Sequence, residues 1–122
     1  MKKKLMRCGI LSRRAFMERT ISIATGDYRP GKDEPKVWFE SLKTMAQILS
    51  ESNLDLLRII EEKKPESITA LAAMTGRKKG NLSRTLKKMQ QYGIVDLKRK
   101  ENNLLEPVVM ATDFRLDYGL SG

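Results

Sequence analysis

Residues 67–95 read SITALAAMTGRKKGNLSRTLKKMQQYGIV and decide the fold. Apolar residues recur every three to four positions on both sides of Gly76, which predicts two short amphipathic helices. Ser67 is a good N-cap for the first helix, and Gly76 suits a tight turn between the two. Gly93 can end the second helix in a left-handed conformation. Two helices joined by such a turn form a helix-turn-helix motif.

The segment that follows, residues 96–109, reads DLKRKENNLLEPVV and predicts a strand, a polar turn and a second strand. We expect the strands over residues 94–98 and 104–110, around a turn at residues 101–103. A hairpin directly after the second helix is the wing of a winged helix-turn-helix domain. The expected fold class is therefore mainly α with a small β-hairpin wing and an N-terminal helical arm.

The second helix of the motif has two different faces. Leu82, Leu86 and Met89 form an apolar stripe, and the opposite face is a row of hydrogen-bond donors. Lys and Arg pair with phosphates, whereas Arg and Asn can also read base edges in the major groove. The N-terminal end of such a helix usually reaches the bases. The residues expected to bind DNA are Arg77, Lys78, Lys79, Gly80, Asn81, Ser83, Arg84, Lys87, Lys88, Lys98, Arg99 and Lys100.

The net charge of +9 is concentrated in two segments. Residues 76–100 hold nine Lys or Arg and a single acid, Asp96, and residues 1–14 hold six cations and no acid. Residues 15–75 and 101–122 are both slightly acidic. Charge that served only solubility would be spread out, so this distribution predicts a polyanionic partner.

Several function classes are disfavoured by composition. The chain has no histidine, which removes the commonest general base and metal ligand. Its single cysteine, Cys8, cannot build a zinc site, and the glycines at 76 and 80 lack the Gly-Lys-Ser/Thr of a phosphate loop. We expect no enzymatic activity, no catalytic residues, no metal and no cofactor. The lone cysteine and the lack of an apolar run of about 20 residues predict a cytoplasmic protein.

The N-terminal third is expected to stand apart from the rest. Residues 1–11 predict a poorly ordered basic arm containing Cys8, and Ser12 can cap a helix that runs to Thr25. The alternation in residues 20–23 also allows a strand, but Phe16 joins the helical face and favours the helix. Residues 27–35, with two prolines and a glycine, predict an extended connector. This division gives residues 1–36 as arm, helix and connector, and residues 37–122 as the winged-helix domain.

Further elements are expected around the motif. Residues 36–39 are β-prone, and Ser41 can cap a helix with apolar residues at 3.6-residue spacing. Asn53 is the expected cap of another helix, which ends before Pro65. Alternation over residues 114–118 predicts a final half-buried strand.

These residues carry a resemblance to a known family. Residues 68–72, 81–86 and 92–95 resemble the winged helix-turn-helix transcriptional regulators of the MarR-like type. Residues 35–39, 75–79 and 81–85 also resemble a narrower group of prokaryotic DNA-binding proteins, some of them described as antitoxins. The resemblance implies a DNA-binding repressor without enzymatic activity.

The chain also departs from the MarR-like pattern. Lys78 stands where the second helix usually has a Ser or Thr cap, which leaves its start less well capped. Arg77 occupies a turn position that is commonly apolar, and the long dimerisation helices of MarR-type proteins are not evident. The resemblance therefore does not say how this chain would dimerise.

The leading hypothesis is a sequence-specific repressor that binds double-stranded DNA as a homodimer. The alternative is an antitoxin whose residues 12–39 cover a toxin, with Trp38 and Phe39 as an anchor, while the winged helix autoregulates the operon. The same two aromatic residues can instead plug the core or form a dimer strand. RNA binding is a third hypothesis, although few aromatics are available to stack on bases. We expect dimerisation through the N-terminal segment, in which case deleting residues 1–36 would give a folded monomer.

Overall fold

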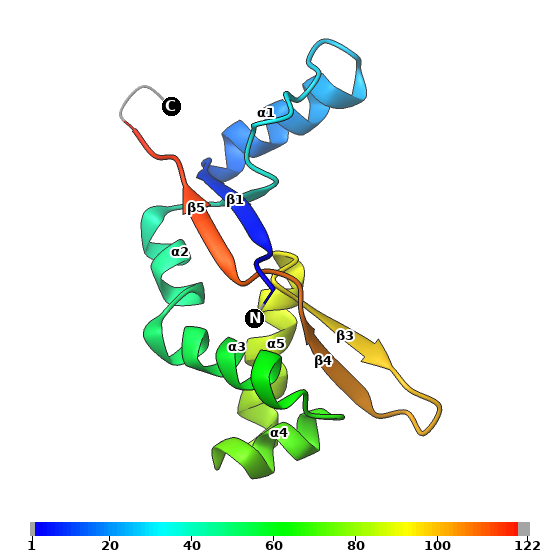
Figure 1. The fold of residues 1–122 in the computed structure, drawn as a ribbon. Helices are drawn as coiled ribbons and strands as arrows, with labels where there is room; N and C mark the ends of the chain where they lie inside the picture. The colour runs from blue at the N-terminus through cyan, green and yellow to red at the C-terminus, as the bar shows by residue number, and fades with distance from the viewer. Residues whose placement is uncertain (1, 120–122) are drawn as a thin grey trace.

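The computed structural model describes residues 2–119, which form five α-helices, a three-stranded sheet and a two-stranded hairpin (Figure 1). Among these residues no helix has the length and apolar character to cross a bilayer. The elements follow one another as β1 (Leu5–Ile10), α1 (Arg13–Ala24), β2 (Val37–Phe39), α2 (Leu42–Ile48), α3 (Glu51–Lys63), α4 (Ile68–Thr75), α5 (Lys79–Gln91), β3 (Val95–Arg99), β4 (Leu105–Val109) and β5 (Asp113–Leu116).

The three-stranded sheet corrects the expectation of a mainly α chain with a poorly ordered arm. Its order is β2-β1-β5 and both pairings are parallel, so β1 is the central strand. Cys8 lies opposite Val37 on one side and Leu116 on the other. Its side chain is 1% exposed, and burial raises the pKa of its thiol. The segment expected to be poorly ordered is therefore the central, partly buried strand of a sheet, and the chain is mixed α/β.

The two faces of this sheet are closed by different aromatic residues. On the outer face the Trp38 ring lies where a Cβ of residue 9 would sit, 2.4 Å away, so only glycine fits at Gly9. On the inner face Phe39 is fully buried and stacks on Tyr92 with ring centroids 4.7 Å apart. The interpretation of Phe39 as an exposed anchor for a partner is wrong, since it belongs to the core.

Helix boundaries follow the predicted caps with one exception. Ser12, Ser41 and Ser67 each accept a hydrogen bond from a main-chain N–H in the first turn of α1, α2 and α4. The strand alternative for residues 20–23 is therefore wrong. Ser50 caps α3, whereas Asn53 lies inside the helix and its side-chain amide donates to the Ile48 carbonyl. The expectation that Asn53 is the cap is wrong, because the helix already begins at Glu51 and the Ser50 hydroxyl accepts a hydrogen bond from the Asn53 N–H.

The core joins both sheets to the helices. Its buried members come from every element except α1 and β5: Cys8, Phe39, Ile48, Leu56, Leu57, Ile60, Ile68, Leu71, Leu82, Leu86, Met89, Ile94, Val95 and Val109. Met6, Ile10, Phe114 and Leu116 pack against it from the inner face of the sheet. Deleting residues 1–36 would remove β1, the strand that holds β2 and β5. That truncation is therefore not expected to leave a folded monomer.

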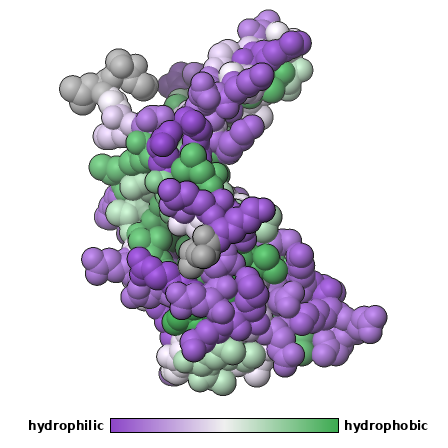
Figure 2. Space-filling view, in the orientation of Figure 1, coloured by the Kyte–Doolittle hydropathy of each residue, from purple (hydrophilic) through white to green (hydrophobic). Residues whose placement is uncertain are grey.

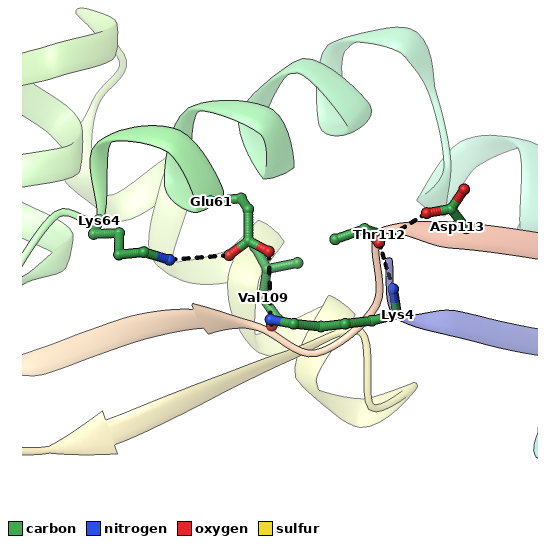
Figure 3. A network of polar contacts seen from close by, with 6 residues as sticks. All are labelled: Lys4, Glu61, Lys64, Val109, Thr112 and Asp113. Atoms are coloured by element: carbon green, nitrogen blue, oxygen red, sulfur yellow. Dashed lines mark hydrogen bonds and ion pairs between the residues drawn. The ribbon is translucent and has the colours of Figure 1, made fainter. Parts of the chain in front are cut away.

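A polar network ties the start of β1 to α3 and to the end of β4 (Figure 3). The Lys4 ammonium lies 3.3 Å from the Glu61 carboxylate and donates to the Val109 carbonyl at 2.9 Å. Lys64 pairs with the same carboxylate at 3.2 Å. Burial raises the pKa of Glu61, but the hydrogen bonds and charges of Lys64 and Lys4 outweigh it and leave that pKa below its ordinary value of 4.5. Lys4 is therefore engaged inside the fold.

Glu61→Gln should lower the free energy of unfolding at pH 7 by about 1–3 kcal/mol, because it removes charged hydrogen-bond partners from Lys4 and Lys64. The pKa of Glu61 in the folded protein is below its ordinary value. The stabilisation that the ionised carboxylate provides is therefore fully present at pH values above the ordinary pKa and is lost as pH falls through the folded-state pKa. Urea unfolding at pH 7 and at pH 3 measures both effects. The exposed neighbour Glu62 provides the control substitution Glu62→Gln, which should leave stability unchanged. If the free energies of unfolding of Glu61→Gln and the unsubstituted protein differed by the same amount at both pH values, the stabilising role of the Glu61 carboxylate would be contradicted.

Candidate nucleic-acid interface

The tight connection between α4 and α5 fixes how α5 is presented. Gly76 has φ +72° and its N–H donates to the Ala72 carbonyl at 2.9 Å, which closes α4. Leu82, Leu86 and Met89 of α5 are at most 1% exposed. This buried stripe is the predicted one, and it leaves the opposite face of the helix in solvent.

The outer face of α5 is a row of polar and basic side chains. Six of the predicted residues lie exposed on it: Lys79, Gly80, Asn81, Arg84, Lys87 and Lys88. Ser83 is half-buried at its edge. The helix has 13 residues and is therefore about 20 Å long. No ion pair among the described residues involves a cation of this row. Its positive charge is therefore available to an external anion.

The start of α5 adds main-chain donors to the row. Lys78 occupies the N-cap and makes no side-chain capping hydrogen bond, in agreement with the poor capping predicted from the sequence. First-turn N–H groups that no side chain caps can bind water or an anion, and the helix dipole favours negative charge there. The sequence predicted the basic and polar side chains of this region, but it did not identify the main-chain N–H groups as additional donors.

Gly80, in the first turn of α5, has no structural requirement for glycine. A Cβ built on it would meet no heavy atom within 4 Å among the described residues. Its φ is not in the left-handed region that favours glycine. Glycine inside a helix costs about 0.5–1 kcal/mol relative to alanine. The missing side chain therefore exposes the backbone of α5 without benefit to the fold.

Arg77 does not join the exposed row. Its guanidinium donates to the carbonyl oxygen of Ser52 at 3.4 Å and also to the Ser52 hydroxyl. The side chain is turned toward α3 and is half-buried. In this structure Arg77 links the turn before α5 to α3, so the structure gives it a positioning role next to the candidate interface.

The three cations of the β3–β4 hairpin differ in their surroundings. Lys98 lies opposite Glu106 in the strand register, and the Lys100 ammonium pairs with the same carboxylate at 3.2 Å. Arg99 points to the other face of the strand, because successive side chains alternate, and it is exposed. Arg99 therefore carries the least compensated positive charge of the hairpin.

The hairpin and α5 lie next to each other in the fold. The hairpin leaves the C-terminal end of α5 after Gly93, at φ +75°, and its tip extends toward the end of the molecule where α4 lies (Figure 1). Hydrophilic side chains cover this hairpin in the space-filling view (Figure 2). The exposed basic residues of α5 and Arg99 thus belong to consecutive elements around one end of the domain.

A family model described as HVO_A0114 matches residues 48–116, more than half of the chain, and the chain belongs to this family. The matched segment runs from the last residue of α2 to the last residue of β5, so it contains the whole candidate interface. No curated protein and no solved structure was found to match the chain.

Gly80→Ala should move stability and nucleic-acid binding in opposite directions. The new methyl group fits without a clash, so the free energy of unfolding should rise by about 0.5–1 kcal/mol. The same methyl group would keep a ligand from the backbone, so affinity should fall. Urea unfolding and fluorescence anisotropy with a labelled duplex measure the two effects, with Gln90→Ala on the exposed side of α5 as the control. A variant that is more stable and binds equally well would show that the backbone at residue 80 is not approached.

Proposed function

We propose that this member of the HVO_A0114 family is a cytoplasmic, sequence-specific regulator that binds double-stranded DNA and acts as a dimeric repressor. In this proposal α4 and α5 form a MarR-like helix-turn-helix and the β3–β4 hairpin is its wing. The observation that carries it is the division of α5 into a buried apolar stripe and an exposed row of cations that lack ion-pair partners among residues 2–119. A helix divided in this way can lie in the major groove with its packing undisturbed.

Position along α5 suggests what each residue contacts. Asn81 and Arg84 lie in the first half of the helix and can donate to base edges, as Asn does to adenine and Arg to guanine. Lys87 and Lys88 lie further along, where phosphate contacts are expected. Arg99 on the hairpin suits a flanking phosphate or the minor groove, whereas Lys100 pairs with Glu106 and Lys98 lies opposite the same acid in the strand register.

The distribution of aromatic residues favours a duplex over single-stranded RNA. Proteins that bind single strands usually stack bases on exposed aromatic rings. No Phe, Tyr or Trp lies in residues 76–91, and Tyr92 is stacked on Phe39 in the core. The basic face therefore suits a phosphate backbone and the groove edges of a duplex.

The antitoxin alternative has less support than the sequence alone suggested. It relied on Trp38 and Phe39 as an anchor for a toxin. Phe39 is fully buried, and Trp38 covers Gly9 inside the chain's own sheet. We therefore keep the regulator as the proposed function.

Binding to duplex DNA should depend steeply on salt. If the exposed cations neutralise about 4–6 phosphates per protomer, log K against log[salt] should have a slope of about −4 to −5 per protomer. Fluorescence anisotropy over a salt series measures the slope, with an RNA of the same sequence as competitor. A flat salt dependence would remove the nucleic-acid assignment, and preferential displacement by RNA would move it to RNA.

Substitutions should separate base readers from phosphate contacts. Arg84→Ala and Asn81→Ala should each reduce the preference for a selected site over random duplex by about 1–3 kcal/mol. Arg99→Ala should weaken binding to all DNA sequences alike and reduce the slope of log K against log[salt] by about 1. Lys98→Ala is the matched control and should have the smaller effect, because Glu106 lies opposite.

Selection of bound fragments from random duplex DNA supplies the site needed for these measurements. If Arg84→Ala weakens selected and random DNA equally, Arg84 is a phosphate contact and the base-reading role is wrong. If selection enriches no sequence at all, the protein binds DNA without sequence preference.

A further inference from the structure

Helix α1 presents its apolar side to solvent. Met17 and Ile21 are 57% and 58% exposed, and Phe16 and Ile23 are also exposed. With Thr20 and Ala24 they form two adjacent rows at three- and four-residue spacing, which is one continuous helix face. The helix has no buried residue and projects from the body of the domain (Figure 1). Hydrophobic side chains are visible along one edge of this projection (Figure 2).

The polar side of α1 is the side held by the rest of the chain. The Arg19 guanidinium pairs with Glu34 at 3.1 Å and lies 5.1 Å from the centre of the Trp38 ring. The Tyr28 N–H donates to the Ser22 carbonyl at 3.1 Å. An isolated amphipathic helix would turn its apolar stripe toward its own core. These contacts fix α1 in the opposite orientation, so the stripe is presented to a partner.

The charges around α1 fit a second copy of the same chain. Residues 12–40 hold six cations and five acids, so this region is nearly neutral although the whole chain carries +9. Arg13 and Arg14 stand at the N-terminal end of α1, where they form exposed ion pairs with Glu40 and Glu18 at 3.3 Å, and Asp27 follows the C-terminal end of the helix. Exposed pairs of this kind contribute little, so both arginines can still interact with a second acid. An antiparallel pair of α1 helices brings each basic end beside the acidic end of the other, and it also aligns the helix dipoles favourably.

The side-chain sizes along the stripe are self-complementary in the same arrangement. If the two-fold axis passes near Thr20, the middle of the stripe, then Phe16 of one copy faces Ala24 of the other. Large side chains thus meet small ones. The Thr20 hydroxyl already donates to the Phe16 carbonyl at 2.9 Å, so bringing it to the axis leaves no donor unsatisfied.

We propose that two copies of this chain pair through an antiparallel contact of their α1 helices, centred on Thr20, with Phe16, Met17, Ile21, Ile23 and Ala24 at the interface. This deepens the proposed function, which requires a dimer but does not identify its surface. The paired helices, each about 18 Å long, form a contact smaller than the roughly 800 Å² per partner of a standard interface. The dimer should therefore dissociate at micromolar concentrations. In Figure 1, α1 lies at the end of the molecule away from α4 and the hairpin tip, so pairing leaves the DNA-binding face open.

Sedimentation of the full chain without DNA tests this proposal independently of the DNA assignment. The unsubstituted protein should show a concentration-dependent monomer–dimer equilibrium. Ile21→Glu should raise its dissociation constant about tenfold or more, because it places a charge inside the apolar contact. Met74→Glu is the matched control: Met74 is 48% exposed on α4 and should leave the equilibrium unchanged. Circular dichroism confirms that both variants fold.

Disulfide trapping tests the register. Thr20→Cys should give a disulfide-linked dimer on oxidation, because the two copies of residue 20 meet at the axis. Glu18→Cys should give no such dimer, because residue 18 is exposed on the flank of α1 and away from the axis. The native Cys8 is buried and should not react. A chain that stays monomeric alone and on DNA overturns the proposal, and so does a dimer unaffected by Ile21→Glu. Equal trapping at residues 18 and 20 overturns the antiparallel register.

Discussion

The parallel pairing of β1 along both of its edges is the constraint on which the rest of the structure depends. Its neighbours are β2, which follows α1, and β5, the last strand of the described chain. The chain segment that contains α2 to α5 and the hairpin therefore leaves this sheet at the end of β2 and returns to it at the start of β5. The sheet is joined to α5 by the stack of Phe39 on Tyr92, so the position of β1 also fixes the C-terminal end of the basic helix.

The same sheet explains the orientation of α1. Parallel sheets are normally covered by helices on both faces. Here the inner face packs on the helical core, whereas the outer face is covered by the Trp38 ring over Gly9 and by the Arg19 guanidinium over that ring. Arg19 lies on the polar side of α1, so its contact with the Trp38 ring turns that side of the helix toward the sheet. The apolar stripe is consequently the side that remains for a partner.

Local signals were sufficient for the part of the fold that carries the candidate interface. The period of Leu82, Leu86 and Met89, the cap at Ser67 and the positive φ of Gly76 and Gly93 all operate within a few residues, and the structure agrees with each. The two short helices α4 and α5, the turn between them and the hairpin were therefore predictable from the sequence. Three adjacent lysines before β1 gave the impression of a solvated arm, because the strand's partners lie about 30 and 110 residues away in the chain.

Partners distant in sequence also account for what the site predictions could not resolve. Residue type alone gave Arg77, Lys98, Arg99 and Lys100 equal weight as DNA-binding residues. The structure distinguishes them, because Ser52 engages Arg77 and Glu106 lies beside Lys98 and Lys100. A sequence pattern gives the side of an element on which a cation stands but not whether an acid from another element already neutralises it.

Separation of charge from apolar surface makes pairing compatible with a strongly basic face. Two copies that each carry +9 would repel one another if their basic rows were adjacent. The basic residues of α5 and the hairpin are separated from α1 by the three-stranded sheet and the helical core (Figure 1). Exposed charges are largely screened beyond a Debye length of about 8 Å at physiological salt. The nearly neutral α1 region is thus the surface of this chain on which a second copy can approach at low electrostatic cost, while both basic faces remain available to a polyanion.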